Sequence, residues 1–228
     1  LRAGIDEGRI VVCANNPYDA AYAARFLDRP VRFVPSLCEY TAVRWQPSER
    51  VLVYYADRRI AELEMDAGHF VHKPRALPRG HAWSDVARQR AIVHFPYNVS
   101  TMSIAEQFTM GVPLLFPTLD YAVRLVSEGA PLFRQTSWVS TFKEPPGSVV
   151  IPPGGFPHGH DPNAYDDMAA TRWWLQYADY YDESSMQGFG YFGSIEELQA
   201  IARERPAYYD ALHMKMRAFY DELARLLE

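Results

Sequence analysis

The residues best suited to chemistry lie in the stretch NVSTMS, between an apolar run and a run with helical spacing. A helix start leaves backbone N–H groups unpaired and carries the positive end of the helix dipole. Such a turn can hold an anion where the side chains around it are small. We therefore expect a phosphate group to contact the backbone around Ser100–Met102. The donor-binding residues predicted in this turn are Asn98, Ser100, Thr101 and Met102.

A carboxylate, Glu106, stands inside the predicted helix that follows the turn. A carboxylate cannot bind phosphate, but it can accept hydrogen bonds from the two vicinal hydroxyls of a ribose. Phosphate at the helix start and ribose at Glu106 together fit a bound nucleoside diphosphate. A plainer interpretation is also open, because Ser103 and Glu106 have the spacing of a capping box, in which they would only stabilise the helix start.

Basic side chains that follow predicted strands could neutralise a diphosphate. Arg58 comes directly after the apolar run VLVYYAD, and Lys73 lies in the loop-like segment 68–82. One or two such cations stabilise a departing diphosphate, so we predict Arg58 and Lys73 as donor-binding residues. The alternative for each is a solvated surface charge. The chain has no GxxxxGK[ST] motif, and no GxGxxG follows a strand, so neither familiar nucleotide motif is present.

A second group of chemically capable residues is His158, His160 and Asp161, in a loop rich in proline and glycine. Two imidazoles and a carboxylate are suitable ligands for zinc or iron. A dinuclear hydrolase would need further histidines at set spacings, which the sequence does not supply, and Asp161 also fits a helix cap. We therefore predict no metal site and no cofactor.

The elements that must position these residues alternate between strands and helices. This order is typical of an α/β fold with a mostly parallel, Rossmann-like sheet flanked by helices. The carboxyl-terminal third is expected to be helical. The predicted strands cover 8–16, 29–36, 51–57, 91–95 and the apolar run behind Gly111. The predicted helices cover 17–28, 58–66, 84–90 (capped by Ser84), the run after NVSTMS, 118–130, 163–181, 194–204 (with a Ser194/Glu197 capping box) and 208–227.

The bulk properties exclude several classes of protein. The chain has 228 residues, of which 48% are hydrophobic and 14% aromatic, so it is long and apolar enough for a sizeable core. Its net charge of −5 and the absence of a basic stripe argue against nucleic acid as a partner. No apolar run reaches the roughly 20 residues of a membrane span. The two cysteines, Cys13 and Cys38, could pair, but free thiols are the favoured interpretation.

The stretch PYNVSTMSIAEQFTMGVPLLFPT resembles the carboxyl-terminal, nucleotide-sugar-binding half of GT-B-fold glycosyltransferases. Their pattern is a strand, a loop of small residues, a helix with a glutamate, and a Gly-[IVT]-Pro turn into the next strand. Many retaining members carry a first glutamate eight positions before the second, where this chain has Asn98. Asparagine can hydrogen-bond a sugar hydroxyl or a phosphate, but it supplies no carboxylate.

The resemblance implies a division of the chain and an activity. Residues 1–48 would be the last strand–helix–strand unit of an amino-terminal Rossmann-like half, and residues 49–228 the nucleotide-sugar-binding domain with its closing helices. The chain begins with Leu1, so we expect a fragment whose missing amino-terminal half supplies the acceptor site and the base. The implied reaction is metal-independent transfer of a hexosyl group from a nucleoside diphosphate sugar to an acceptor hydroxyl.

Two alternatives from other classes stay open. The same turn could serve a non-catalytic nucleotide- or sugar-binding module, and His158, His160 and Asp161 could build a metal-dependent hydrolase. The sequence names no catalytic residue, sugar, acceptor or cellular compartment.

Overall fold

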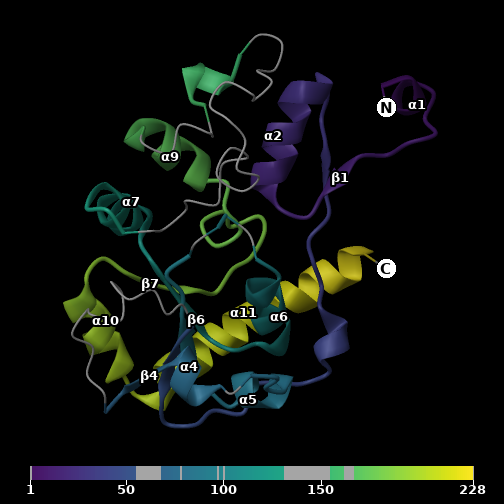
Figure 1. Cartoon of the computed structure of the whole chain (residues 1–228). Coiled ribbons are helices and arrows are strands. Elements are labelled where there is room, and N and C mark those ends of the chain that lie inside the picture. The colour runs from purple at the N-terminus through teal and green to yellow at the C-terminus, as the bar shows by residue number, and fades with distance from the viewer. Residues whose placement is uncertain are drawn as a thin grey trace.

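Five parallel strands build the central sheet (Figure 1). The strands are β3 (Val51–Val53), β4 (Phe70–His72), β5 (Ala91–Val93), β6 (Leu114–Pro117) and β7 (Gly190–Phe192). Their spatial order is β4-β3-β5-β6-β7, and every neighbouring pair is parallel. The computed structural model describes residues 2–54, 68–77, 79–96, 98–99, 101–130, 155–161 and 167–227. The predicted α/β fold with a Rossmann-like parallel sheet is confirmed.

Helices flank this sheet and close the chain (Figure 1). The helices are α1 (Arg2–Asp6), α2 (Pro17–Leu27), α4 (Lys73–Ala76), α5 (Trp83–Ala87), α6 (Met102–Met110), α7 (Leu119–Ser127), α9 (Met168–Leu175), α10 (Ile195–Ala202) and α11 (Pro206–Leu227), with the 3-10 turns η1 (Glu39–Thr41) and η2 (Pro157–Gly159). Helix α6 leads from β5 to β6 and packs against α5 and α11, while α7 packs against β6 and α9.

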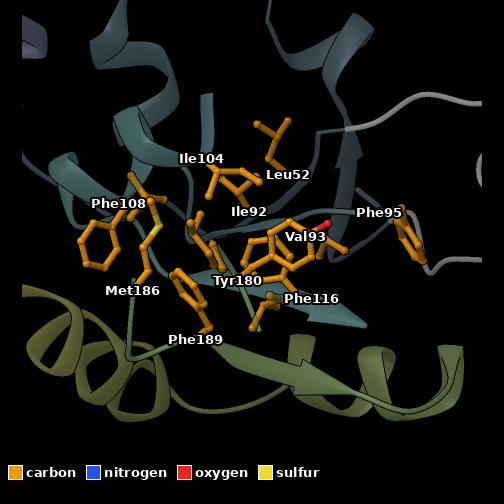
Figure 2. Packing of buried hydrophobic residues seen from close by; sticks show 14 of the residues in the cluster. Leu52, Ile92, Val93, Phe95, Ile104, Phe108, Phe116, Tyr180, Met186 and Phe189 are labelled. Carbon is orange, nitrogen blue, oxygen red and sulfur yellow. The ribbon is translucent and has the colours of Figure 1, made fainter. Parts of the chain in front are cut away.

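The inner strands are continuous apolar runs because both faces of the sheet are covered. Every residue of β3 and β5 has 0% exposure. Figure 2 shows Ile104 and Phe108 of α6 reaching into the same cluster as Ile92. On this cluster the rings of Phe116 and Tyr180 stack with their centroids 4.8 Å apart. Burial of each large apolar side chain contributes about 1.5–3 kcal/mol, so this core fixes where the strand ends lie.

The first strands form a separate unit. Strands β1 (Cys13–Ala14) and β2 (Arg32–Phe33) pair in parallel as a two-stranded sheet, with α2 between them along the chain. Asn16 caps α2 by accepting a 2.7 Å hydrogen bond from the Asp19 N–H. The predicted strand–helix–strand order is confirmed, while the domain boundary at residue 48 stays a prediction. The unit's membership of an amino-terminal half also stays a prediction.

Aromatic side chains join this first unit to the second half of the chain. The ring of Tyr18 lies 5.1 Å from that of Trp174, and the ring of Tyr22 lies 6.0 Å from that of Phe156. The Trp/Tyr-rich segment near residue 174 therefore serves as core packing in this region. Trp174 itself is only 2% exposed.

The carboxyl-terminal third is mainly helical as predicted, with α9, α10 and α11, but it also contains strand β7, which was not predicted. Residues Gly190–Phe192 pair with Leu115–Pro117 of β6. The helix predicted over 163–181 is shorter and begins at Met168, since the Asp167 carboxylate accepts hydrogen bonds from the N–H groups of the first turn.

Two predicted helix caps also differ. Ser84 lies inside α5, and the Asp85 carboxylate accepts a 3.0 Å hydrogen bond from the Ala82 N–H before it. Ser194 caps α10 as predicted, but the Glu197 carboxylate accepts from the Gly193 N–H at 2.6 Å, so the capping box is not reciprocal. The helix predicted over 58–66 lies outside the described residues.

The predictions about membrane spans and cysteines concern the part of the chain that the structure describes. Within it, no helix is both long and apolar enough to span a membrane. Cys13 and Cys38 are free thiols, the first exposed and the second buried.

We expect Gly111→Ala to lower the free energy of unfolding by about 2–5 kcal/mol. Gly111 ends α6 with a φ of 76°, where a left-handed conformation costs an alanine roughly 1–2 kcal/mol. Its new Cβ would also lie 2.8 Å from the His213 ring, and overpacking adds about 1–3 kcal/mol.

Gly80→Ala is the matched control, because Gly80 has the same φ of 76° and a Cβ added there would meet open space. It should cost about 1 kcal/mol, from the conformation alone. Urea denaturation of both variants measures the difference, and equal losses would show that the contact between Gly111 and His213 is not tight.

Candidate functional site

The order in which the chain adds strands to the sheet reverses between β3 and β5. From β3 the chain moves to β4 on one side, and from β5 it moves to β6 on the other. In parallel α/β sheets ligands bind at the carboxyl ends of the strands beside such a switch point. Three side chains follow strand ends at this edge, namely Tyr54 after β3, Lys73 after β4 and His94 after β5.

These three side chains form one chain of contacts with helix α6. The Lys73 Nζ lies 3.7 Å from the centroid of the Tyr54 ring, and the Tyr54 and His94 ring centroids are 5.1 Å apart. The His94 Nε2 and the Gln107 Oε1 are 2.6 Å apart. We call Tyr54, Lys73, His94 and Gln107 the switch-point cluster. The predicted donor-binding residue Lys73 is thus placed at the carboxyl edge, over an aromatic face.

His94 is a neutral, fixed member of this cluster. Burial, opposed by the hydrogen bond to Gln107 and helped by the Lys73 charge, lowers the pKa of its imidazole to about 4. Because the Gln107 oxygen accepts, the proton of the neutral ring sits on Nε2. The ring also stacks on Phe116 with the centroids 5.3 Å apart. His94 was not identified from the sequence, where its one signal is a polar residue ending the apolar run AIVHF.

The start of α6 lies in the turn predicted to hold phosphate. Thr101 precedes the helix, its side chain makes no capping hydrogen bond, and its Oγ1 lies 3.1 Å from the Ser103 Oγ. Met102 is the first helical residue and is 48% exposed. Ser100 lies outside the described residues, as does the predicted cation Arg58.

The segment after α9 fixes the backbone of this turn. The Tyr180 hydroxyl donates a 2.9 Å hydrogen bond to the Asn98 carbonyl oxygen, and the Asp179 N–H donates to the Val99 oxygen at 3.3 Å. Asp179 is only 3% exposed and was not identified from the sequence.

Glu106 does not form the capping box with Ser103. Helix α6 begins at Met102, so Ser103 lies inside the first turn. The Glu106 carboxylate instead accepts a hydrogen bond from the hydroxyl of Tyr40 in η1, and this bond raises the pKa of the Tyr40 phenol. Tyr40 is 62% exposed. The carboxylate is therefore held at a partly open position.

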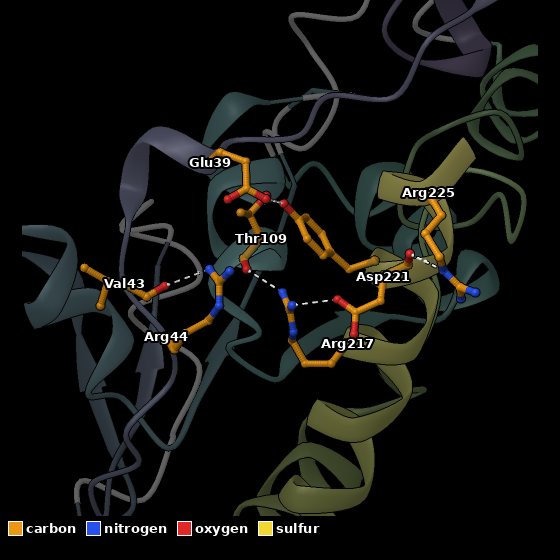
Figure 3. Close-up of polar contacts among 8 residues, drawn as sticks. Glu39, Val43, Arg44, Thr109, Arg217, Asp221 and Arg225 are labelled. Atoms are coloured by element: carbon orange, nitrogen blue, oxygen red, sulfur yellow. Dashed lines mark hydrogen bonds and ion pairs between the residues drawn. The ribbon is translucent and has the colours of Figure 1, made fainter. Parts of the chain in front are cut away.

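The segment around η1 is anchored to α6 and α11. The Cys38 N–H donates to the Thr109 Oγ1 at 3.0 Å, and the Tyr220 hydroxyl donates to the Glu39 carboxylate. Figure 3 shows that Arg217 of α11 also links the two helices, because its guanidinium donates to the Thr109 carbonyl oxygen at 3.1 Å. The segment that carries Tyr40 is thus held by contacts with both α6 and α11.

The histidines of the predicted metal alternative lie elsewhere, at η2. The rings of His158 and His160 each lie 5.8 Å from the Trp173 ring. Among the described residues, no group of three or more His, Cys, Asp or Glu side chains is arranged to hold a metal ion.

A second place that could hold a ligand is a hollow of about 430 Å³. It is lined by Ser48, Glu49, Arg50, Val71, Ala76 and Gln89. Ser48–Arg50 precede β3 and Gln89 precedes β5, while Val71 lies in β4 and Ala76 in α4. The hollow therefore runs from the amino ends of β3 and β5 past β4 to α4. None of the predicted donor-binding residues lines it. We place the candidate site at the carboxyl edge, because parallel sheets bind ligands there.

No protein-family model, curated protein or solved structure matches the chain. What the site can do is therefore judged from its geometry.

We expect His94 to make the protein less stable in mild acid. The pKa of its imidazole is about 4 in the folded protein and about 6.5 in the unfolded chain, so the unfolded chain binds more protons between these values. Stability from His94 is therefore complete above pH 6.5 and is lost as the pH falls toward 4. The loss attributable to this residue is about 3 kcal/mol.

The double variant His94→Phe/Gln107→Leu removes the titration without leaving a buried amide unpaired, and Gln107→Leu alone is the control that keeps the imidazole. Urea denaturation at pH 7.5 and pH 4.5 should give a smaller difference in unfolding free energy for the double variant than for the control. Equal differences would contradict the assignment.

Proposed function

We propose that the carboxyl edge at the switch point binds the nucleoside diphosphate of a nucleotide-sugar. In this proposal the chain is the donor-binding part of a glycosyltransferase of the hexosyltransferase type. The observation that carries the proposal is the position of Lys73, Tyr54 and His94. They come from three neighbouring strands, meet at one strand edge and are joined to α6 through Gln107.

Lys73 and the start of α6 are the two positive features of the proposed site. An ammonium group and a helix N-terminus both favour the charge that develops on a departing diphosphate. His94, which is neutral, adds no charge and holds α6 against the end of β5. We therefore propose that donor binding needs no metal ion.

Glu106 is proposed to accept the ribose hydroxyls. A carboxylate offers about four lone-pair sites, and the Tyr40 hydroxyl occupies one of them. The remaining sites can accept one or two hydroxyl groups. Asn98, Ser100, Thr101 and Met102 keep their predicted role around the phosphates.

The proposed reaction transfers the sugar from phosphate to an acceptor. The bond between the anomeric carbon and the diphosphate oxygen breaks, and a bond from that carbon to the acceptor oxygen forms. The acceptor proton passes to a base, and the nucleoside diphosphate leaves. We assign neither the acceptor nor the base to residues of this chain, in keeping with a partner half that supplies them.

The second candidate function is a non-catalytic module that binds a nucleotide or sugar through the same residues. The resemblance of the NVSTMS–GVP stretch to a donor-binding half favours the transferase. The sequence encoded upstream of Leu1 separates the two, because a Rossmann-like half with an Asp, Glu or His base would favour the transferase.

Lys73→Met should weaken binding of a nucleoside diphosphate about tenfold or more. Hydrogen bonds and ion contacts to charged groups contribute about 1.5–3 kcal/mol, and methionine keeps an unbranched side chain of similar length while removing the charge. Calorimetric titration of UDP, GDP and ADP in buffer with EDTA measures the effect without metal.

Lys215→Met is the matched control, because Lys215 is exposed on α11 and its loss changes the net charge equally. Its affinity should equal that of the parent. A parent protein that binds none of the three diphosphates, with or without Mg²⁺, would contradict the proposed function.

Glu106→Gln should weaken a ribonucleoside diphosphate about tenfold, since the ribose hydroxyls lose a charged acceptor. The matching 2′-deoxynucleotide has already lost one of the two contacts, so its affinity should change much less. Glutamine keeps an oxygen for the Tyr40 hydroxyl, and the melting temperature should stay close to that of the parent. Equal affinity of the parent for the ribo and deoxy forms would remove the ribose role.

A further inference from the structure

Tyr40 is a large aromatic side chain held rigidly but left open to solvent. Its ring is 62% exposed, while its hydroxyl donates to the Glu106 carboxylate. The residues before it are held in place, because the Cys38 N–H donates to Thr109 of α6 and the Glu39 carboxylate accepts from Tyr220 of α11. Single exposed aromatic residues are common, so exposure alone carries nothing. The position beside Glu106 distinguishes this one.

A second aromatic ring borders the same place. The Trp83 ring, at the start of α5, meets the Tyr40 ring nearly edge-on, with the centroids 6.3 Å apart and an angle of 62° between the planes. An edge-to-face pair covers at most one face of either ring, and with Tyr40 62% exposed the other face of its ring is open. Tyr40 thus offers an oriented face, fixed at its tip by Glu106 and at its side by Trp83.

The covalent structure of a nucleotide determines what can reach this face. The base is attached to the ribose carbon next to the one that bears the 2′ hydroxyl. A ribose whose hydroxyls bind Glu106 therefore brings its base close to the Glu106 carboxylate. Tyr40 is the aromatic face in contact with that carboxylate.

We propose that the nucleobase of the donor stacks on Tyr40. This inference rests on the proposed function, and it deepens it by naming the surface that holds the base. Glu106 then has two tasks, because it orients the Tyr40 ring and accepts the ribose. Every nucleobase has a π-face, so Tyr40 contributes affinity for nucleotides in general and not a choice among bases.

The test separates the π-face of Tyr40 from its hydroxyl. Tyr40→Ala removes both, Tyr40→Phe removes only the hydroxyl, and Met214→Ala is the control for loss of an exposed apolar side chain, since Met214 is 65% exposed on α11. Each protein is titrated with a nucleoside diphosphate and with ribose 5-diphosphate, which lacks the base. Where Tyr40→Ala does not fold, Tyr40→Leu takes its place.

Stacking of a base is worth about 1–3 kcal/mol, so Tyr40→Ala should weaken the nucleoside diphosphate roughly 5- to 150-fold. Ribose 5-diphosphate should bind this variant as it binds the parent, and Tyr40→Phe should bind the nucleotide within about threefold of the parent. Met214→Ala should change neither affinity.

Two other outcomes would overturn the inference while the proposed function stands. In the first, the parent and Tyr40→Ala bind the nucleotide equally. In the second, Tyr40→Phe and Tyr40→Ala both bind it more tightly than the parent, which would make the Tyr40 hydroxyl a competitor for Glu106. A parent that binds no nucleoside diphosphate defeats the proposed function first.

Discussion

The hydrogen bond between His94 and Gln107 holds helix α6 against the end of strand β5. Both side chains are buried, at 5% and 1% exposure, so each would be an unpaired polar group without the other. His94 directly follows β5, and Gln107 lies within α6, so the bond links the strand end to the helix. Its loss would shift the helix start and Glu106 together. The proposed site therefore depends on an interaction that need not touch any ligand.

The different faces of helix α6 make different contacts. Ile104 and Phe108 enter the core, Gln107 holds His94, and Glu106 faces outward to Tyr40. The helix ends at Gly111, and because glycine has no Cβ the His213 ring of α11 can approach closely. Because the core and α11 fix the helix on two sides, its outward face can carry a polar group in a defined direction.

The sequence predicted the α/β class and most of the helices, since hydrophobic spacing and caps are local signals. It did not predict β7, because Gly190–Phe192 lies in an aromatic and glycine-rich stretch and becomes a strand only by pairing with β6. Gly190 also permits this pairing, since a Cβ there would lie 2.5 Å from the Leu115 side chain.

The candidate site was predicted only in part. Asn98, Thr101, Met102 and Glu106 were found in one local motif, and Lys73 was one of several basic residues until its position over Tyr54 distinguished it. His94 and Tyr40 were missed because their roles arise from contacts across the fold. Tyr40 is 66 positions from Glu106, a separation that no periodic pattern detects.

Hydrogen–deuterium exchange with and without a saturating nucleoside diphosphate tests the location of the site most directly. We expect slower exchange of the backbone amides in residues 98–106, at the carboxyl ends of the strands and away from the residues that line the hollow. Protection confined to residues 48–50 and 89–90, around the hollow at the amino ends of the strands, would contradict the switch-point site. So would protection confined to residues 155–161.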